Sequence, residues 1–190
     1  MSSNFTVVYD ACVLYPAPLR DFLMWLALTD LFRARWTNEI HEEWMQSVLK
    51  NRPDLKREQL ERTRDMMNSH VRDCLVTGHE SLIETITLPD PGDRHVVAAA
   101  IKSGASLIVT FNLKDFPTSA LAPLDIEAQH PDEFIAHQID LHVAKIIEAA
   151  ANHRRSLQNP PKTADEYLDT LLNQGLVETV KELRKFRVAI

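Results

Sequence analysis

The chain has 190 residues, 45% of them hydrophobic, which is enough to bury a substantial core in one domain or in one domain with an appendage. Its net charge of −6 argues against the strongly basic surface of a non-specific nucleic-acid coat. The two cysteines, Cys12 and Cys74, form no CxxC pair, which argues against a disulfide scaffold and a zinc site. With four glycines and no GxSxG, the sequence also lacks a phosphate-cradling loop, a dinucleotide fingerprint and the commonest serine-hydrolase signature.

Two further observations concern location and metal ligands. No charged lead-in followed by a secretory apolar stretch opens the sequence, and the longest apolar runs, such as 22–28, are too short to span a bilayer. Together with the cysteine usage, this leads us to expect a cytoplasmic protein. The eight histidines show no ligand spacing such as HExxH, so we interpret most of them as surface or boundary residues.

Strands and helices alternate from the start of the chain. Residues 5–9 are β-rich and end in Asp10, at the position where open α/β sheets place their sites, although a turn aspartate after a strand is an equally good interpretation. Residues 18–34 predict an apolar helix that lacks a clean polar face, buried in the core or against a second subunit. A homodimer through this helix is therefore our hypothesis. A short strand at 36–37 follows it.

The next helix, over 39–50, carries two candidate acids. Thr37 or Asn38 caps its N-terminus. Glu42 and Glu43 fall on opposite flanks of its buried side, so helical periodicity does not choose between them. For either glutamate considered alone, a solvated helix face is the more common role.

The stretch from Leu88 to Phe116 predicts a turn, a helix and a buried strand. The helix begins near Asp93 and keeps the apolar spacing of one helix face up to residue 101. Gly104 suits a left-handed helix stop, and residues 107–109 are a short apolar run typical of a strand buried on both faces. Asp93 therefore opens a helix, where the helix dipole favours an anion whether or not the residue has a function.

Three more segments complete the α/β part. Residues 54–73 predict a charged helix with a scaffolding or substrate-edge role, residues 80–88 are ambiguous between helix and strand, and residues 124–128 predict a last short strand. The alternation of elements predicts a mostly parallel sheet covered by helices, which is an α/β fold.

From about residue 131 the pattern becomes all-helical, interrupted by the Asn-Pro-Pro-Lys run at 159–162. We therefore expect an α/β domain over residues 1–130 and a helical C-terminal extension over 131–190 that packs on it. Four cations near the end form either a solvated face, which we favour, or a basic edge for RNA: Lys181, Arg184, Lys185 and Arg187.

Several acids fall at the ends of predicted elements: Asp10, Glu42 or Glu43, Asp90, Asp93 and Asp115. If the strands are parallel neighbours, these carboxylates meet at one edge of the sheet. Carboxylates that share a pocket repel each other, so they either hold protons or bind cations. Oxygen ligands favour Mg²⁺ or Mn²⁺ over zinc, and phosphodiester hydrolysis is the natural reaction of such a site.

Four motifs, taken in order, resemble the PIN domain, in particular the VapC-type toxin ribonucleases of bacterial toxin–antitoxin pairs. They are VVYDACVLYP, TNEIHEEW, LPDPGDRHVVAAAI and ASLIVTFNLKDF, and the resemblance runs from about residue 5 to 128. It implies a flavodoxin-like parallel sheet and Mg²⁺- or Mn²⁺-dependent endonucleolytic cleavage of RNA. It also implies inhibition by a small cognate antitoxin whose tail occupies the acidic pocket.

The resemblance also assigns roles to positions of this chain. Asp10, Glu43, Asp93 and Asp115 match the family's acids and are the implied metal ligands and catalytic residues. Glu43, which directly precedes a large residue, matches better than Glu42.

Three further positions receive secondary roles. Asp90 belongs to a DPxD pattern and is a secondary ligand or a helix cap. Asn112 stands where relatives are often polar or acidic, and as an amide it suits a supporting role. Thr110 and Asn112 can position a water or ligand, although a polar cap after a strand is their more common role. The helical extension departs from the compact PIN domain and resembles extensions on some longer members.

Three alternatives remain at this point. The first is a PIN nuclease that processes RNA or DNA without an antitoxin. The second is a binding module whose acidic pocket holds a partner's arginine, or a metal, without turnover; the presence of all four acids argues against it. The third is a phosphate-accepting receiver domain, whose usual lysine after a late strand has no convincing counterpart in Lys114.

Overall fold

The centre of the molecule is a four-stranded parallel sheet with the strand order β2-β1-β3-β4. The structure, a computed structural model, describes residues 5–190. The strands are short: β1 Thr6–Tyr9, β2 Arg33–Arg35, β3 Leu107–Val109 and β4 Glu127–Gln129. β1 and β3 are buried along their whole length, as the apolar runs in the sequence predict. The α/β fold with a parallel sheet is thereby confirmed.

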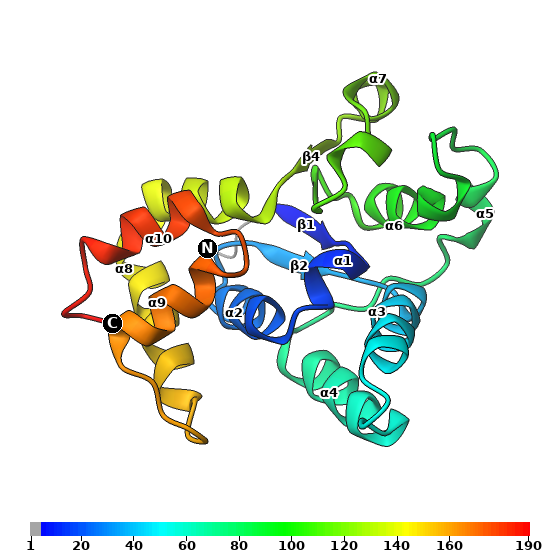
Figure 1. The fold of residues 1–190 in the computed structure, drawn as a ribbon. Helices are drawn as coiled ribbons and strands as arrows, with labels where there is room; N and C mark the ends of the chain where they lie inside the picture. The colour runs from blue at the N-terminus through cyan, green and yellow to red at the C-terminus, as the bar shows by residue number, and fades with distance from the viewer. Residues whose placement is uncertain (1–4) are drawn as a thin grey trace.

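Helices connect the strands and cover the sheet (Figure 1). The helices before the central stretch are α1 Ala11–Leu14, α2 Ala17–Ala27, α3 Asn38–Asn51, α4 Arg57–His70 and α5 Glu80–Ile83. Those of the central stretch are the 3₁₀ helix η1 Pro91–Asp93, α6 Arg94–Ser103, the 3₁₀ helix η2 Leu113–Asp115, α7 Thr118–Leu121 and the 3₁₀ helix η3 Ala122–Leu124. The C-terminal helices are α8 Pro131–Ser156, α9 Ala164–Leu172 and α10 Val177–Arg184.

Local signals set several of these boundaries as expected. The Thr37 hydroxyl accepts a hydrogen bond from the Ile40 N–H at 3.1 Å, so Thr37, and not Asn38, caps α3. Gly104 ends α6 with a φ of 63°, a left-handed conformation that costs a glycine little.

The structure differs from the sequence prediction between residues 18 and 37. The predicted helix over 18–34 ends at Ala27, and the chain turns through Asp30, whose φ is 58°. The second strand then lies at Arg33–Arg35 rather than at 36–37. The prediction missed this strand because two of its three residues are arginines, so it does not form an apolar run. Trp36 instead forms an isolated parallel bridge with Leu75.

Two other segments also differ. Within residues 80–88 the structure has the short helix α5 and no strand. β4 begins at Glu127, after a left-handed turn at Asp125, and not at residue 124.

The C-terminal helices form a layer against α2 on the side of the molecule away from α3 and α6 (Figure 1). Phe22 of α2 stacks on the ring of His153 of α8 at 5.9 Å and meets the ring of Tyr167 of α9 edge-on at 6.5 Å. The face of α2 that carries Phe22 is thus covered within one chain, which weakens the reason for the expected homodimer, and the dimer itself stays a prediction. Helix α8 has one non-helical residue, His142, at a kink.

Side-chain pairing decides between the two roles expected for the cations near the C-terminus. Each of the four C-terminal cations lies in an ion pair, namely Lys181–Glu178, Arg184–Asp169, Lys185–Glu182 and Arg187–Asp165. They therefore form a charge-balanced, solvated face.

The expectation that most histidines are surface or boundary residues is wrong for four of the eight, because His41, His79, His95 and His153 are buried. Among residues 5–190, none of the helices combines the length and apolar character needed to cross a bilayer.

Candidate functional site

Three of the four predicted acids line one cavity. Asp10 follows β1, Glu43 lies on α3 and Asp93 precedes α6, and their side chains border a cavity of about 550 Å³ together with Asn112. The parallel order β2-β1-β3 brings these element ends to the same edge of the sheet. Asp115, at the end of η2, does not line this cavity.

Asp10 is the most firmly held of these acids. It is 4% exposed, and its Oδ1 accepts a hydrogen bond from the Ala11 N–H at 2.7 Å, as the N-cap of α1. Its Oδ2 accepts hydrogen bonds from the Thr110 hydroxyl at 2.7 Å and the Cys12 thiol at 3.0 Å. The carboxylate is therefore fixed by partners from α1 and from the residue that follows β3, which removes most of its freedom to rotate.

Cys12 and Thr110 serve this arrangement and not a reaction of their own. Burial, followed by the charge of Asp10, raises the pKa of the Cys12 thiol to about 12. The thiol is thus protonated at neutral pH and is a poor nucleophile. Its Sγ accepts a hydrogen bond from the Phe111 N–H at 3.3 Å, and the Thr110 hydroxyl accepts one from the Asn112 N–H at 3.0 Å. The turn after β3 is tied to α1 in this way.

The two neighbouring glutamates of α3 have different partners. Glu42 accepts hydrogen bonds from Arg57 of α4 at 2.9 and 2.6 Å, and these bonds lower the pKa of Glu42 to about 2. Glu43 instead faces the cavity. The geometry therefore distinguishes the pair, which helical periodicity could not.

The buried His95 contacts the Glu43 carboxylate and positions it. It is 3% exposed, and its Nε2 lies 2.9 Å from Glu43 Oε1, while its Nδ1 lies 3.6 Å from Glu39 Oε2. Burial lowers the pKa of His95, but the hydrogen bond to Glu43 and the charges of Glu43 and Glu39 outweigh it, and the net shift is upward. The sequence prediction missed His95. The available signal was its place two residues after Asp93, on a helix that begins at the site.

The pKa of Asp93 is raised by burial and by the carboxylates around it. Burial comes first among the causes that raise its pKa to about 6, followed by the charges of Asp10, Asp90, Asp115 and Glu43. Although Asp115 does not line the cavity, its negative charge thus raises the pKa of Asp93. The Asp90 side chain accepts a hydrogen bond from the Gly92 N–H at 2.8 Å, as the cap of η1.

The donor set fits a hard divalent cation. Carboxylate and amide side chains line the cavity, and its lining contains no Lys or Arg. The pKa of Asp93 is raised by burial and then by the neighbouring carboxylates, and a bound cation would offset the repulsion among them. Within residues 5–190, no three His, Cys, Asp or Glu side chains lie close enough to form a ready-made cage. Mg²⁺ does not need one, because it usually binds through one or two carboxylates and keeps several waters.

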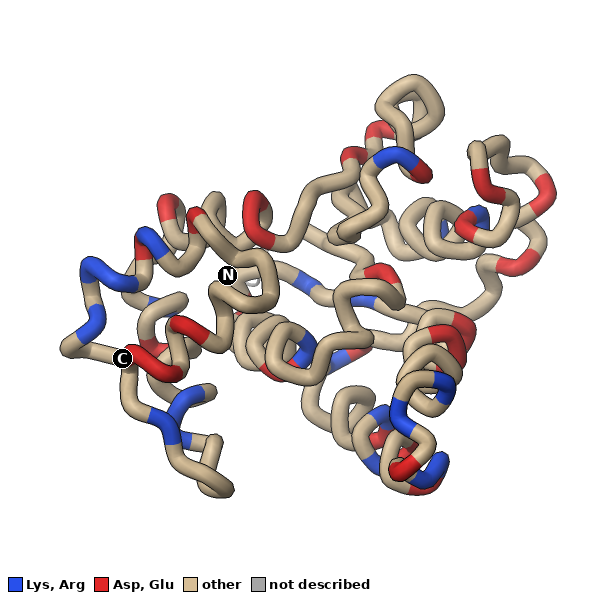
Figure 2. Tube along the Cα trace, viewed as in Figure 1, with Lys and Arg blue, Asp and Glu red and all other residues tan. Residues whose placement is uncertain are grey.

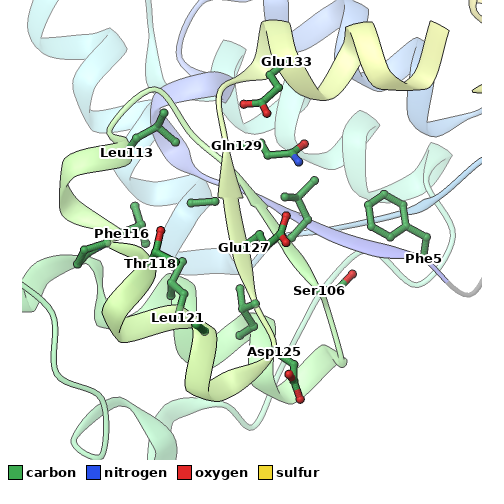
Figure 3. A pocket seen from close by; sticks show the side chains of 15 residues that line it. Phe5, Ser106, Leu113, Phe116, Thr118, Leu121, Asp125, Glu127, Gln129 and Glu133 are labelled. Atoms are coloured by element: carbon green, nitrogen blue, oxygen red, sulfur yellow. The ribbon is translucent and has the colours of Figure 1, made fainter. Parts of the chain in front are cut away.

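A larger cavity, of about 830 Å³, lies beside β4 and α7 and has a different character. Its wall is largely apolar, including Leu113 and Phe116. Figure 3 shows Asp125, Glu127 and Glu133 spread from the turn before β4 to the start of α8 rather than converging on one point. The larger cavity therefore lacks the close set of carboxylates that lines the smaller, acidic cavity.

Comparisons with known proteins agree with this geometry. Residues 6–114 match the family model described as PIN domain, and residues 131–185 match the one described as VapC50 C-terminal domain. A Mycobacterium tuberculosis protein named "Putative ribonuclease VapC50" is 43% identical over 94 residues, which are 50% of this chain and 56% of that protein. The alignment thus spans little more than half of the relative. No solved structure matches the chain significantly. Because the first match covers more than half of the sequence, the chain belongs to the PIN-domain family, in a VapC-type form that carries a VapC50 C-terminal domain.

Proposed function

We propose that this protein is a Mg²⁺- or Mn²⁺-dependent endoribonuclease that acts as the toxin of a toxin–antitoxin pair. The observation that carries the proposal is the convergence of Asp10, Glu43 and Asp93 on one cavity without a cationic side chain. A relative named as a ribonuclease supports RNA as the substrate. The oxygen ligands support Mg²⁺ or Mn²⁺ as the metal.

In this proposal Asp10, Glu43 and Asp93 hold the metal, and Asn112 and Asp115 lie at the edge of the site. When bound, the dication neutralises charge on the phosphodiester and makes a nearby water more acidic. The chain's own contribution is to fix the carboxylates before the substrate arrives, so that little reorganisation remains for the reaction.

Each carboxylate is fixed in its own way. Thr110 and the N-terminus of α1 orient Asp10, and the buried His95 orients Glu43. The pKa of Asp93, about 6, means that a proton and the metal compete for this carboxylate in mildly acidic solution.

The antitoxin part of the proposal has a candidate surface. A groove of about 340 Å³ between α2 and α4 is lined by apolar side chains that include Trp25 and Met67, and Leu28 and Met66 at this groove are exposed. Such a groove suits the apolar face of an amphipathic helix. Co-purification with a small protein encoded beside this one, lost on Met66→Glu, tests the partner. Retention of that complex by the variant would exclude the groove. We place both partners and the RNA in the cytoplasm.

The nuclease part is tested by incubating a mixed RNA pool with the purified protein in Mg²⁺, Mn²⁺ or EDTA. We expect cutting with metal, none in EDTA, and none by an Asp10→Asn/Asp93→Asn double variant. Glu42→Gln, on the same helix as Glu43 but paired with Arg57, is the matched control and should cut like the wild type. Cutting that survives the double substitution would place the reaction elsewhere. No cutting by folded, metal-loaded protein would favour a binding module.

A further inference from the structure

Helix α3 carries a polar row that leads away from the acids. Glu43, Ser47 and Asn51 are spaced four residues apart, so they stack on one helix face, and all three line the acidic cavity. At 1.5 Å per residue, Asn51 lies about 12 Å along the helix axis from Glu43. The row therefore begins at the proposed metal site and ends beyond it, where a nucleotide adjoining the scissile phosphate would lie.

At the far end of the row, Asn51 and Tyr15 hold each other in place and each keeps one hydrogen-bonding group available for a ligand. The Asn51 amide nitrogen donates to the Tyr15 hydroxyl at 3.2 Å and to the Ser47 carbonyl oxygen at 3.0 Å. Both N–H groups are thus engaged. Within residues 5–190, the structure gives no partner to the Asn51 carbonyl oxygen or to the Tyr15 O–H as a donor. An acceptor and a donor are left side by side at the wall of the cavity.

A basic segment continues the row beyond Asn51. Residues 50–64, at the end of α3 and the start of α4, hold six Lys or Arg against three Asp or Glu, in a protein with a net charge of −6. Figure 2 shows Lys and Arg, with Asp and Glu between them, at this corner below the end of α3. Arg52 and Arg57 are paired with Asp54 and Glu42, whereas Lys50 and Lys56 are exposed and lie in no ion pair among residues 5–190. Positive charge at this place attracts a phosphate backbone that leaves the acidic cavity.

We propose that the row from Ser47 to Asn51, with Tyr15 opposite, binds the nucleotide next to the scissile phosphate of a single-stranded RNA. Tyr15 and Asn51 contact the edge of its base through their donor and acceptor, and Lys50 contacts the phosphate that follows. The inference rests on the proposed ribonuclease function and adds a subsite to it. Protein readout of single-stranded RNA commonly takes this form, with an unstacked base held by hydrogen bonds on its edge and by an aromatic side chain.

The test compares protein variants on RNA substrates that carry or lack the base in question. A 20-nucleotide single-stranded RNA of mixed sequence is cut in Mn²⁺, the cut positions are mapped, and substrates lacking one base at a time around the cut bond are then compared. The variants are Tyr15→Phe and Asn51→Ala. Gln46→Ala is the matched control, because Gln46 lies on α3 but outside the cavity, and among residues 5–190 its side chain bonds only to Glu42.

We expect each variant to raise KM about three- to tenfold on the intact RNA, the effect of one hydrogen bond, with little change in kcat. Removal of one particular base takes away both contacts, so it should cost the wild type more than either substitution does, and it should cost each variant less than it costs the wild type because that variant has already lost one contact. On the substrate that lacks this base, the variants and the wild type should therefore be equal. Lys50→Gln should flatten the dependence of log kcat/KM on log salt concentration by about 0.7, the slope for one phosphate contact on a single strand.

Two outcomes overturn the subsite. If the variants lose activity equally on every substrate, including all those lacking a base, Tyr15 and Asn51 do not contact a base. If they match the wild type on intact RNA, the row takes no part in binding. Both outcomes leave the nuclease in place. Absence of cutting by the wild type itself refutes the proposed function, and the subsite with it, so the two failures are distinguishable.

Discussion

Replacing Asp93 by Asn should make the metal-free protein more stable. The pKa of Asp93 rises from 3.8 to about 6, and at roughly 1.4 kcal/mol per unit this corresponds to about 3 kcal/mol against the ionised form at neutral pH. Asp93 is only partly buried, so solvent screening reduces this by about half. Loss of a charge at the N-terminus of α6 costs about 0.5 kcal/mol in return. The net expectation is a gain of about 1 kcal/mol at pH 7.5.

The same argument fixes the sign of the pH dependence. The folded-state pKa of Asp93 lies above the unfolded value, so the folded protein binds the proton more tightly. Stability from this group is fully present below pH 3.8 and is lost as the pH rises through about 6. The variant lacks this titration, so its advantage should appear between pH 4 and 6.5 and level off above it.

The assay is urea unfolding in EDTA across that pH range, followed by circular dichroism. Asp132→Asn is the control of opposite sign, because the Asp132 carboxylate accepts hydrogen bonds from the Glu178 and Thr179 N–H groups at 2.9 and 2.8 Å, at the start of α10. Its substitution should destabilise by about 1 kcal/mol. Added Mn²⁺ should then stabilise the wild type more than Asp93→Asn. An Asp93→Asn protein less stable than the wild type at pH 7.5 would refute the idea that uncompensated charge dominates the site.

Three further predictions concern single residues. Glu43→Gln should abolish RNA cleavage while Glu42→Gln leaves it unchanged, and equal losses in a gel-based cleavage assay would contradict the geometry. His95→Leu should weaken Mn²⁺ binding measured by calorimetry about tenfold, and His95→Gln, which keeps a donor near Nε2, should recover most of it; equal affinities would show that His95 only fills space. Burial lowers the pKa of His153 to about 4, so its stability contribution is present above pH 6.5 and is lost as the pH falls through 4. His153→Asn, which keeps a polar group near the Tyr167 hydroxyl, should reduce the loss of unfolding free energy between pH 7 and pH 4 by up to about 3 kcal/mol, and an unchanged acid profile would exclude His153 as its source.

The sequence predicted elements whose signals are local. β1 and β3 are apolar runs, Gly104 marks a helix end, and Thr37 marks a helix start, so neighbouring residues suffice to find them. β2 escaped because Arg33 and Arg35 flank a single buried Ala34, and only its pairing with β1 makes it a strand.

The same division separates the parts of the site. Acids at strand and helix ends are readable because parallel topology gathers those ends, and Asp10 and Asp93 meet for that reason. The choice between Glu42 and Glu43 depends on Arg57, which reaches Glu42 from another helix. The role of His95 depends likewise on a contact between α6 and α3. Such contacts between distant segments leave no periodic trace in the sequence.

The cover on α2 has a consequence for how the chain is made. Phe22 and its apolar neighbours on α2 are buried by α8 and α9, which the ribosome synthesises much later. Until residues 131–172 have emerged, the growing chain presents a bare apolar helix face to chaperones and to other nascent chains. The part of the protein that carries the acidic cavity is therefore made first and stabilised last.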